Sequence, residues 1–131
     1  MPNLVQIFTE TIKQWEHIEA APHRFGGTEF KVGKVEIGHI HNYNGMVDIP
    51  FTVKVREVLV RDGLADYHHL LKDSGWITYF VRDEYSLKHA IWLMRLSYLQ
   101  KMSRRDARYN NEIDVLNMSS GLKQVAFPKQ A

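Results

Sequence analysis

The stretch KVEIGHIHNYNGMVDIPF, residues 34–51, decides the fold of this 131-residue chain. Apolar and polar residues alternate on both sides of the turn signal Asn42-Tyr43-Asn44-Gly45, a pattern typical of two antiparallel strands joined by a tight turn. Strict alternation predicts one face with Val35, Ile37, His39, His41 and Tyr43, and a second face with Glu36, Gly38, Ile40 and Asn42. We therefore expect both histidines on the apolar face.

Upstream of this hairpin, Gly33-Lys34 suits a turn to a preceding strand in the run from residue 23, which completes a three-strand meander. Pro50 is expected at a strand end or a sheet edge. Residues 3–18 predict a helix with Asn3 as its N-cap, ended by Ala20-Ala21-Pro22. Its apolar stripe comprises Leu4, Ile7, Phe8, Ile12 and Trp15.

Downstream, residues 53–62 predict a short helix that Gly63 follows. Residues 65–71 and 76–81 predict either two strands or a strand and a loop, and a long helix with a broad apolar face begins at Asp83. The fold class is therefore α+β. We expect an antiparallel β-meander of about five strands, flanked by an N-terminal helix, a short middle helix and a long C-terminal helix.

The composition sets further limits. An apolar content of 44% with 24% charged residues is typical of one globular domain, which we place at residues 1–102, followed by a polar extension, 103–131, that is partly helical or loose. The chain has no cysteine, which excludes disulfides and thiol catalysis, and its net charge of +2 gives no case for nucleic acid. Without a long apolar run we expect no membrane partner and a cytoplasmic location. The broad apolar helix leaves a homodimer open.

Four of the seven histidines lie in two short segments, His39 with His41 and His68 with His69. Histidine titrates near neutral pH and is also the commonest metal ligand. Residues two apart on a strand are roughly 7 Å apart, so His39 and His41 can converge on one small ligand. Because neighbours on a strand point to opposite faces, at most one of His68 and His69 is expected to join them. The alternative is a pair of core histidines bonded to Glu29, Asp48 or backbone carbonyls.

Four other residue positions could belong to the same site. Glu29 and Asp48 are candidate bases if a partly apolar pocket raises their pKa, although Glu29 could equally pair with Arg24. Gly27 would let a ligand approach the backbone or would form a bulge, and Trp76 would line a ligand or belong to the core. A transition metal needs three or four ligands, and only Glu29, Asp48 and His68 or His69 could add to the pair. We expect neither a metal nor another cofactor.

Several motifs in order give a family resemblance. They are Phe25-Gly26-Gly27-Thr28-Glu29-Phe30, Gly38-His39-Ile40-His41, Val47-Asp48-Ile49-Pro50-Phe51, Asp62-Gly63-Leu64-Ala65, His68-His69, Ser74-Gly75-Trp76-Ile77 and Ala90-Ile91-Trp92-Leu93 with Leu96-Ser97-Tyr98. Over about residues 23–99 this pattern resembles the luciferase-domain family, a bacterial and fungal family. Its members from bioluminescent fungi oxidise a hydroxypyrone luciferin with molecular oxygen.

The resemblance and the histidines together predict a small-molecule ligand and a cofactor-independent oxygenase of an enol or pyrone-type substrate. We expect His39 or His41 as the base, Glu29 or Asp48 to orient it, and His68 or His69 to steady the substrate oxygen. Gly27 and Trp76 would complete the ligand site. The alternative function is a non-catalytic ligand-binding or interaction domain.

Overall fold

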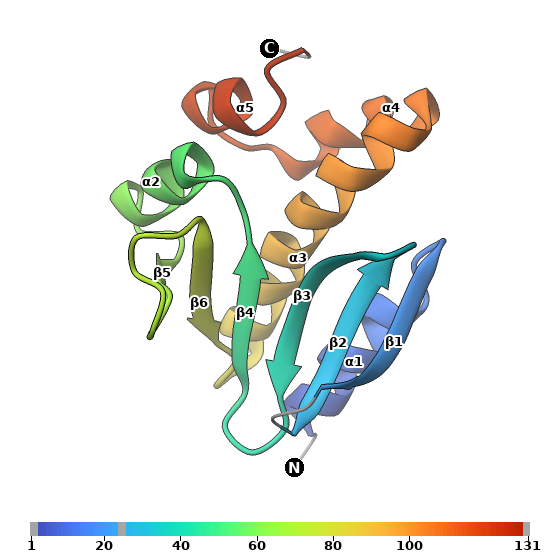
Figure 1. Ribbon diagram of the computed structural model, residues 1–131, viewed down its shortest axis with the longest axis vertical. Coiled ribbons are helices and arrows are strands. Elements are labelled where there is room, and N and C mark those ends of the chain that lie inside the picture. The colour runs from blue at the N-terminus through green and yellow to red at the C-terminus, as the bar shows by residue number, and fades with distance from the viewer. Residues whose placement is uncertain (1–2, 24–25, 130–131) are drawn as a thin grey trace.

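The computed structural model describes residues 3–23 and 26–129, and it shows an α+β fold around one antiparallel sheet (Figure 1). The strand order is β1-β2-β3-β4-β6-β5. The strands are β1 (Ile18–His23), β2 (Gly27–Val32), β3 (Val35–His41), β4 (Met46–Pro50), β5 (Asp66–Tyr67) and β6 (Trp76–Phe80). The expected antiparallel sheet is therefore confirmed, with six strands where about five were predicted. The meander extends only from β1 to β4, because β6 lies between β4 and β5.

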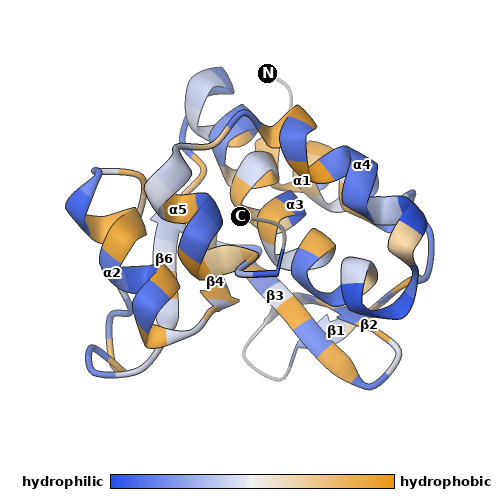
Figure 2. Ribbon diagram, turned by 90° about the horizontal axis from the view of Figure 1, so that it is seen from above, coloured by the Kyte–Doolittle hydropathy of each residue, from blue (hydrophilic) through white to orange (hydrophobic). Residues whose placement is uncertain are grey.

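Two helices, α1 (Leu4–Lys13) and α3 (Glu84–Arg105), cover one face of this sheet. The other helices are α2 (Val53–Arg61), α4 (Asn110–Ile113) and α5 (Ser120–Ala126), with 3₁₀ turns at Ala107–Tyr109 and Asp114–Leu116. Helices α1 and α3 lie behind the strands in Figure 1, and the view from above in Figure 2 shows both of them on one side of β1, β2 and β3. The other side of these strands is the face on which the candidate site lies.

The N-terminal helix is shorter than the sequence predicts. It ends at Lys13, and the chain turns at His17, whose φ is 66°, into strand β1. The prediction was wrong because the apolar spacing of Trp15 and Ile18 fits a helix as well as it fits a turn and an edge strand. Pairing of Ile18 with Val32 extends the sheet by one strand, a long-range hydrogen-bond pattern that local spacing does not report.

The middle of the chain follows the sequence more closely. Helix α2 occupies the expected position, and its N-cap Thr52 accepts a hydrogen bond from the Val55 amide. Of residues 65–71, predicted as a strand or a loop, only Asp66–Tyr67 form a strand, and the following residues form a loop. This loop carries His68 and His69, so their directions are set by the loop and not by strand alternation.

A β-bulge in β3 changes which residues share a face. Phe30 pairs with Gly38 and Lys31 pairs with Glu36, which leaves Ile37 as an extra residue opposite β2. Ile37 and Ile40 are both fully buried in the core, whereas Glu36 shares the opposite face with His39. The prediction that Ile37 and His39 share a face was therefore wrong, because the bulge shifts the alternation by one residue.

Only glycine fits at position 38, because α3 passes directly behind it. A Cβ there would lie 2.6 Å from Cε of Met94, and the φ of Gly38 is +153°. Helix α3 is capped as expected, since Asp83 accepts a hydrogen bond from the Ser86 amide and Ser86 caps in return. The close approach lets α3 bury the apolar face of the sheet, and Leu93, Met94, Leu96 and Leu99 are all fully buried.

The C-terminal residues contribute to the same core. Tyr109, Ile113, Leu122 and Phe127 are buried in it, beside residues of α2 and α3. The apolar face of α3 is thus covered within the chain, which removes the reason for expecting a homodimer from that face. No helix of the described part of the chain has the length and apolarity that a membrane span requires. The boundary at residue 102 stays a prediction.

Lys101 on α3 allows a test of core electrostatics. Burial lowers the pKa of its amine to about 8, and the charge of Arg104 acts in the same direction. The folded pKa lies below the reference value of 10.5, so the ammonium form destabilises the fold below about pH 8 and stability rises between about pH 8 and 10.5. We expect Lys101→Met to raise the free energy of unfolding at pH 7 by about 1–3 kcal/mol.

Urea unfolding at pH 7 and pH 10 measures this effect, and the gain should shrink at the higher pH. Lys88→Met is the matched control, because Lys88 is an exposed residue of the same helix. A gain of equal size at both pH values, or an equal gain in the control, contradicts the prediction.

Candidate functional site

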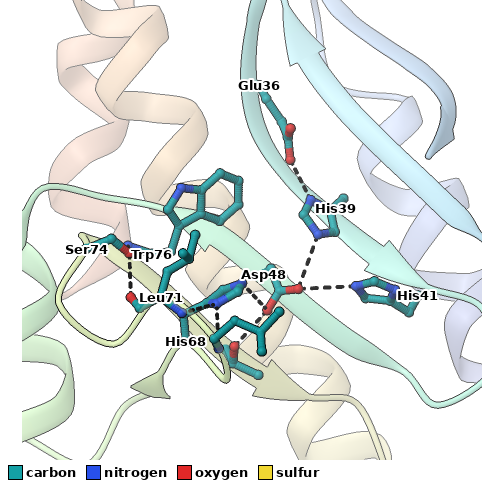
Figure 3. A network of polar contacts seen from close by, with 10 residues as sticks. Glu36, His39, His41, Asp48, His68, Leu71, Ser74 and Trp76 are labelled. Carbon is teal, nitrogen blue, oxygen red and sulfur yellow. Dashed lines mark hydrogen bonds and ion pairs between the residues drawn. The ribbon is translucent and has the colours of Figure 1, made fainter. Parts of the chain in front are cut away.

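Asp48 is the centre of a polar cluster on the face of the sheet opposite α3 (Figure 3). It is 1% exposed and lies on β4, directly across from His39 on β3. The Nε2 atoms of His39 and His41 each lie 3.2 Å from the same carboxylate oxygen, Oδ2 of Asp48. Strand alternation places the two imidazoles side by side, and the next strand supplies the carboxylate between them.

The other carboxylate oxygen faces β6 and the loop after β5. Thr78, the register partner of Asp48, donates its hydroxyl hydrogen to Oδ1 over 2.7 Å. Nε2 of His68 lies 3.6 Å from the same oxygen. Burial raises the pKa of Asp48, but hydrogen bonds from His39 and Thr78 and the charge of His68 outweigh this and lower it to about 2. Asp48 is therefore ionised near neutral pH.

His39 lies between two carboxylates, as Figure 3 shows. Its Nδ1 is 2.7 Å from Oε2 of Glu36, and its Nε2 faces Asp48. Carboxylates are acceptors, so both ring nitrogens donate when both bonds form, and the ring is then an imidazolium. Burial lowers the pKa of His39, but hydrogen bonds to Asp48 and Glu36 dominate and raise it to about 9.

His68 is held by the backbone of its own loop. Its Nδ1 accepts hydrogen bonds from the amides of Leu70 at 3.1 Å and Leu71 at 3.0 Å. A neutral imidazole that accepts at Nδ1 carries its proton on Nε2, the nitrogen that points toward Asp48. Burial lowers the pKa of His68, although the Asp48 carboxylate opposes this. His68 is thus a fixed hydrogen-bond donor on the floor of the site.

His23 adds a ring that the sequence did not place. It ends β1 and stacks on His39 with ring centroids 4.0 Å apart. Gly27 pairs with both His23 and His41 in the two flanking ladders, so no side chain stands between these rings. Burial lowers the pKa of the His23 imidazole, and the neighbouring His39 lowers it further.

Of the other residues predicted for the site, His41 belongs to the cluster, whereas His69 and Glu29 lie beside it. Nδ1 of His41 is buried and has no hydrogen-bond partner among the described residues. His69 is exposed, with its ring centroid 4.2 Å from that of His68. Glu29 pairs with His39 in register, but its carboxylate contacts Lys31 at 3.2 Å. Its alternative partner Arg24, like the motif residue Phe25, lies outside the described residues.

The cluster forms the floor of a cleft of about 780 Å³. Trp76 is half-buried in its wall, with its ring 5.6 Å from His39 and 6.0 Å from His68, measured between centroids. Apolar side chains at the rim are unusually exposed, with Leu70 at 80% and Tyr43 at 76%. The cleft is lined by His23, Glu36, His39, His41, Tyr43, Met46, Asp48, His68, His69, Leu70, Leu71 and Trp76.

The structure thus brings together His39, His41, Asp48, His68, His69 and Trp76. Glu29 and Gly27 are neighbours of the cluster and do not line the cleft. Sequence reasoning missed Glu36, Thr78 and the position of His23. Glu36 could have been found only from the β-bulge, which places residues 36 and 39 on one face of the sheet. No local sequence pattern indicates Thr78, because it reaches Asp48 through the pairing of β4 with β6.

The fold and this cluster define an α+β domain with a buried carboxylate, ringed by imidazoles, on the open face of its sheet. Residues 34–97 match the family model described as "Luciferase domain", which supports a luciferase-domain family for this part of the chain. The match confirms the resemblance that the motifs predict, and it contains every cluster residue except His23. The chain matches no curated protein and no solved structure.

Proposed function

We propose that the cleft binds a small apolar molecule with an acidic enol, and that the domain acts on it as an oxygenase. The observation that carries this proposal is the convergence of three imidazoles, those of His39, His41 and His68, around Asp48 at the floor of a cleft with an apolar rim. Its volume of about 780 Å³ lies within the range of small-molecule sites. The luciferase-domain family provides the second support.

The contacts within the cluster support a role for three of the imidazoles. Both nitrogens of His39 face carboxylates, so His39, when no metal ion is bound, serves as a cation that Asp48 and Glu36 orient. His68 presents an Nε2 hydrogen that steadies the substrate oxygen. His23 is half-buried, lines the cleft beside His39, and is the imidazole best placed to take the enol proton. This assignment moves the base from His39 or His41 to His23.

The proposed reaction needs no external reductant, because the substrate itself supplies the electrons that reduce dioxygen. His23 removes the proton of the enol, and the resulting carbanion supplies the electron pair that reduces dioxygen. A carbon–oxygen bond forms, and the peroxide oxygen takes the proton back from His23. General-base catalysis of this kind typically contributes about 10²–10⁴-fold to the rate.

Oxygen uptake with a simple hydroxypyrone tests the proposal. We expect uptake by the wild-type protein and a loss of about 10²-fold or more in His23→Gln. Binding of the pyrone, measured by calorimetry, should change much less, because His68 and Trp76 remain. His17→Asn is the matched control, since His17 is exposed outside the cleft and asparagine tolerates its positive φ.

Two results would contradict the activity. Wild-type uptake no faster than the buffer, or equal rates in His23→Gln and the wild type, ends the case for His23-dependent oxygenation. Pyrone binding without uptake would then favour the non-catalytic ligand-binding alternative.

A further inference from the structure

We propose that His39, His41 and Asp48 form a binding site for one divalent first-row transition-metal ion. The proposal concerns the cleft described above but does not require the oxygenase reaction. It stands on the arrangement of the three side chains, which are all buried and whose candidate ligand atoms lie within 4.8 Å of one another. Two imidazoles and one carboxylate with further positions open are a donor set that Fe(II) and Zn(II) accept.

The distances fit an ion at this point. Metal–ligand bonds of about 2.0–2.2 Å place neighbouring ligand atoms roughly 3–3.5 Å apart. Both Nε2 atoms lie 3.2 Å from Oδ2 of Asp48, so a small movement of the side chains would make room for an ion between them. The remaining positions of the ion would face the cleft, which all three residues line.

Glu36 gives a second, independent indication. It accepts a hydrogen bond from Nδ1 of His39 at 2.7 Å, on the opposite side of the ring from Asp48. A carboxylate at the distal nitrogen is the usual partner of a metal-binding histidine, because it fixes the ring and directs Nε2 toward the ion. Thr78 does the same for Asp48, since it occupies Oδ1 and leaves Oδ2 toward the two imidazoles.

Hydrogen bonding also excludes a competing ligand set. Asp48, His68 and His69 are close enough to hold an ion as well. The Nδ1 of His68, however, accepts from the amides of Leu70 and Leu71, so the single proton of the neutral ring must stay on Nε2. A neutral His39 instead keeps its proton on Nδ1, toward Glu36, and its Nε2 is then free to bind an ion. His69 is exposed. We therefore assign the ion to His39 and His41, and His68 to hydrogen bonding beside it.

Cobalt(II) and zinc(II) alone test the assignment, without any organic ligand. Protein without a histidine tag is stripped with a chelator, and Co²⁺ is titrated while visible absorption is recorded. We expect one saturable equivalent with the d–d bands of a nitrogen- and oxygen-ligated ion, displaced by Zn²⁺. His39→Gln should abolish the bands, and Glu36→Gln should weaken binding by about 10–100-fold.

His69→Gln is the matched control, because His69 lines the same cleft but lies outside the proposed ligand set. We expect its Co²⁺ affinity to stay within about threefold of the wild type. Circular dichroism and thermal unfolding show whether each variant folds, and Glu36→Gln keeps the test informative if His39→Gln does not.

Three results would overturn the metal site. They are an absence of d–d bands in the wild type, unchanged binding in a folded His39→Gln, and a loss in His69→Gln as large as that in Glu36→Gln. The metal titration contains no organic substrate, so its result does not depend on whether the protein consumes oxygen.

Discussion

Asp48→Asn is expected to lower the free energy of unfolding by about 3–5 kcal/mol, measured by urea unfolding in the presence of a chelator. The wild-type carboxylate receives hydrogen bonds from His39, His41 and Thr78, and it is 1% exposed. An amide has no charge to balance the His39 imidazolium, and its NH₂ group would face N–H donors. The substitution therefore leaves a buried cation with only Glu36 as its partner.

Asp66→Asn is the matched control. It replaces the same carboxylate by the same amide, but at an exposed position on the neighbouring edge of the sheet. Its effect should lie within about 0.5 kcal/mol of zero. A loss below about 1 kcal/mol for Asp48→Asn would show that the three hydrogen bonds do not hold the cluster together. It would also remove the physical basis for the ordered imidazoles on which both proposals depend.

Gly27→Ala is expected to cost about 3 kcal/mol or more, because the added methyl group has no space. A Cβ at Gly27 would lie 2.0 Å from the carbonyl oxygen of Ile40, a backbone atom of the neighbouring strand. No rotamer change relieves such a contact, so β2 and β3 must separate locally. Because His41 pairs with Gly27, this separation would also disturb the imidazole cluster.

Gly121→Ala provides the comparison. Gly121 lies in helix α5, and the nearest atom to its added Cβ is a side-chain nitrogen of Arg61 at 3.7 Å, which is ordinary contact. We expect this variant to be as stable as the wild type or up to about 1 kcal/mol more stable. If Gly27→Ala keeps full stability but loses affinity for the pyrone, Gly27 serves ligand approach and its close packing against β3 is unimportant.

The same glycine illustrates how packing and site geometry depend on each other. Gly27 lets β2 approach β3, and it leaves His23 and His41 without a side chain between them. Gly38 lets α3 approach the opposite face at Met94. Strands β2 and β3 are therefore positioned by close contacts outside the cleft, so substitutions at these two glycines should disturb the imidazole cluster.

Much of the fold could be predicted because its signals are local. The turn at residues 42–45, the cap of α3 at Asp83 and the glycine after α2, Gly63, lie beside the elements that they begin or end. The N-terminal helix was predicted too long, since its spacing does not distinguish a helix from an edge strand. That edge strand exists only because β2 offers it hydrogen bonds.

The candidate site was predicted in part for the same reason. His39, His41 and Asp48 stood out by residue type and by their places on two strands joined by a turn. Glu29 was expected as a partner, but the structure gives that position to Glu36. A single extra residue, Ile37, reverses the alternation of the first half of β3 and places Glu36 beside His39.

The amino-acid sequence by itself determined the α+β class, the central hairpin, the long buried helix and the family, because periodicity, turn residues and motif order are properties of neighbouring residues. Tertiary structure alone decided which face carries the imidazoles and which groups reach Asp48. His39 is nine residues from Asp48 and Thr78 is thirty. Such contacts follow from strand register and one bulge, which depend on how separate segments pair and not on the residues of either segment alone.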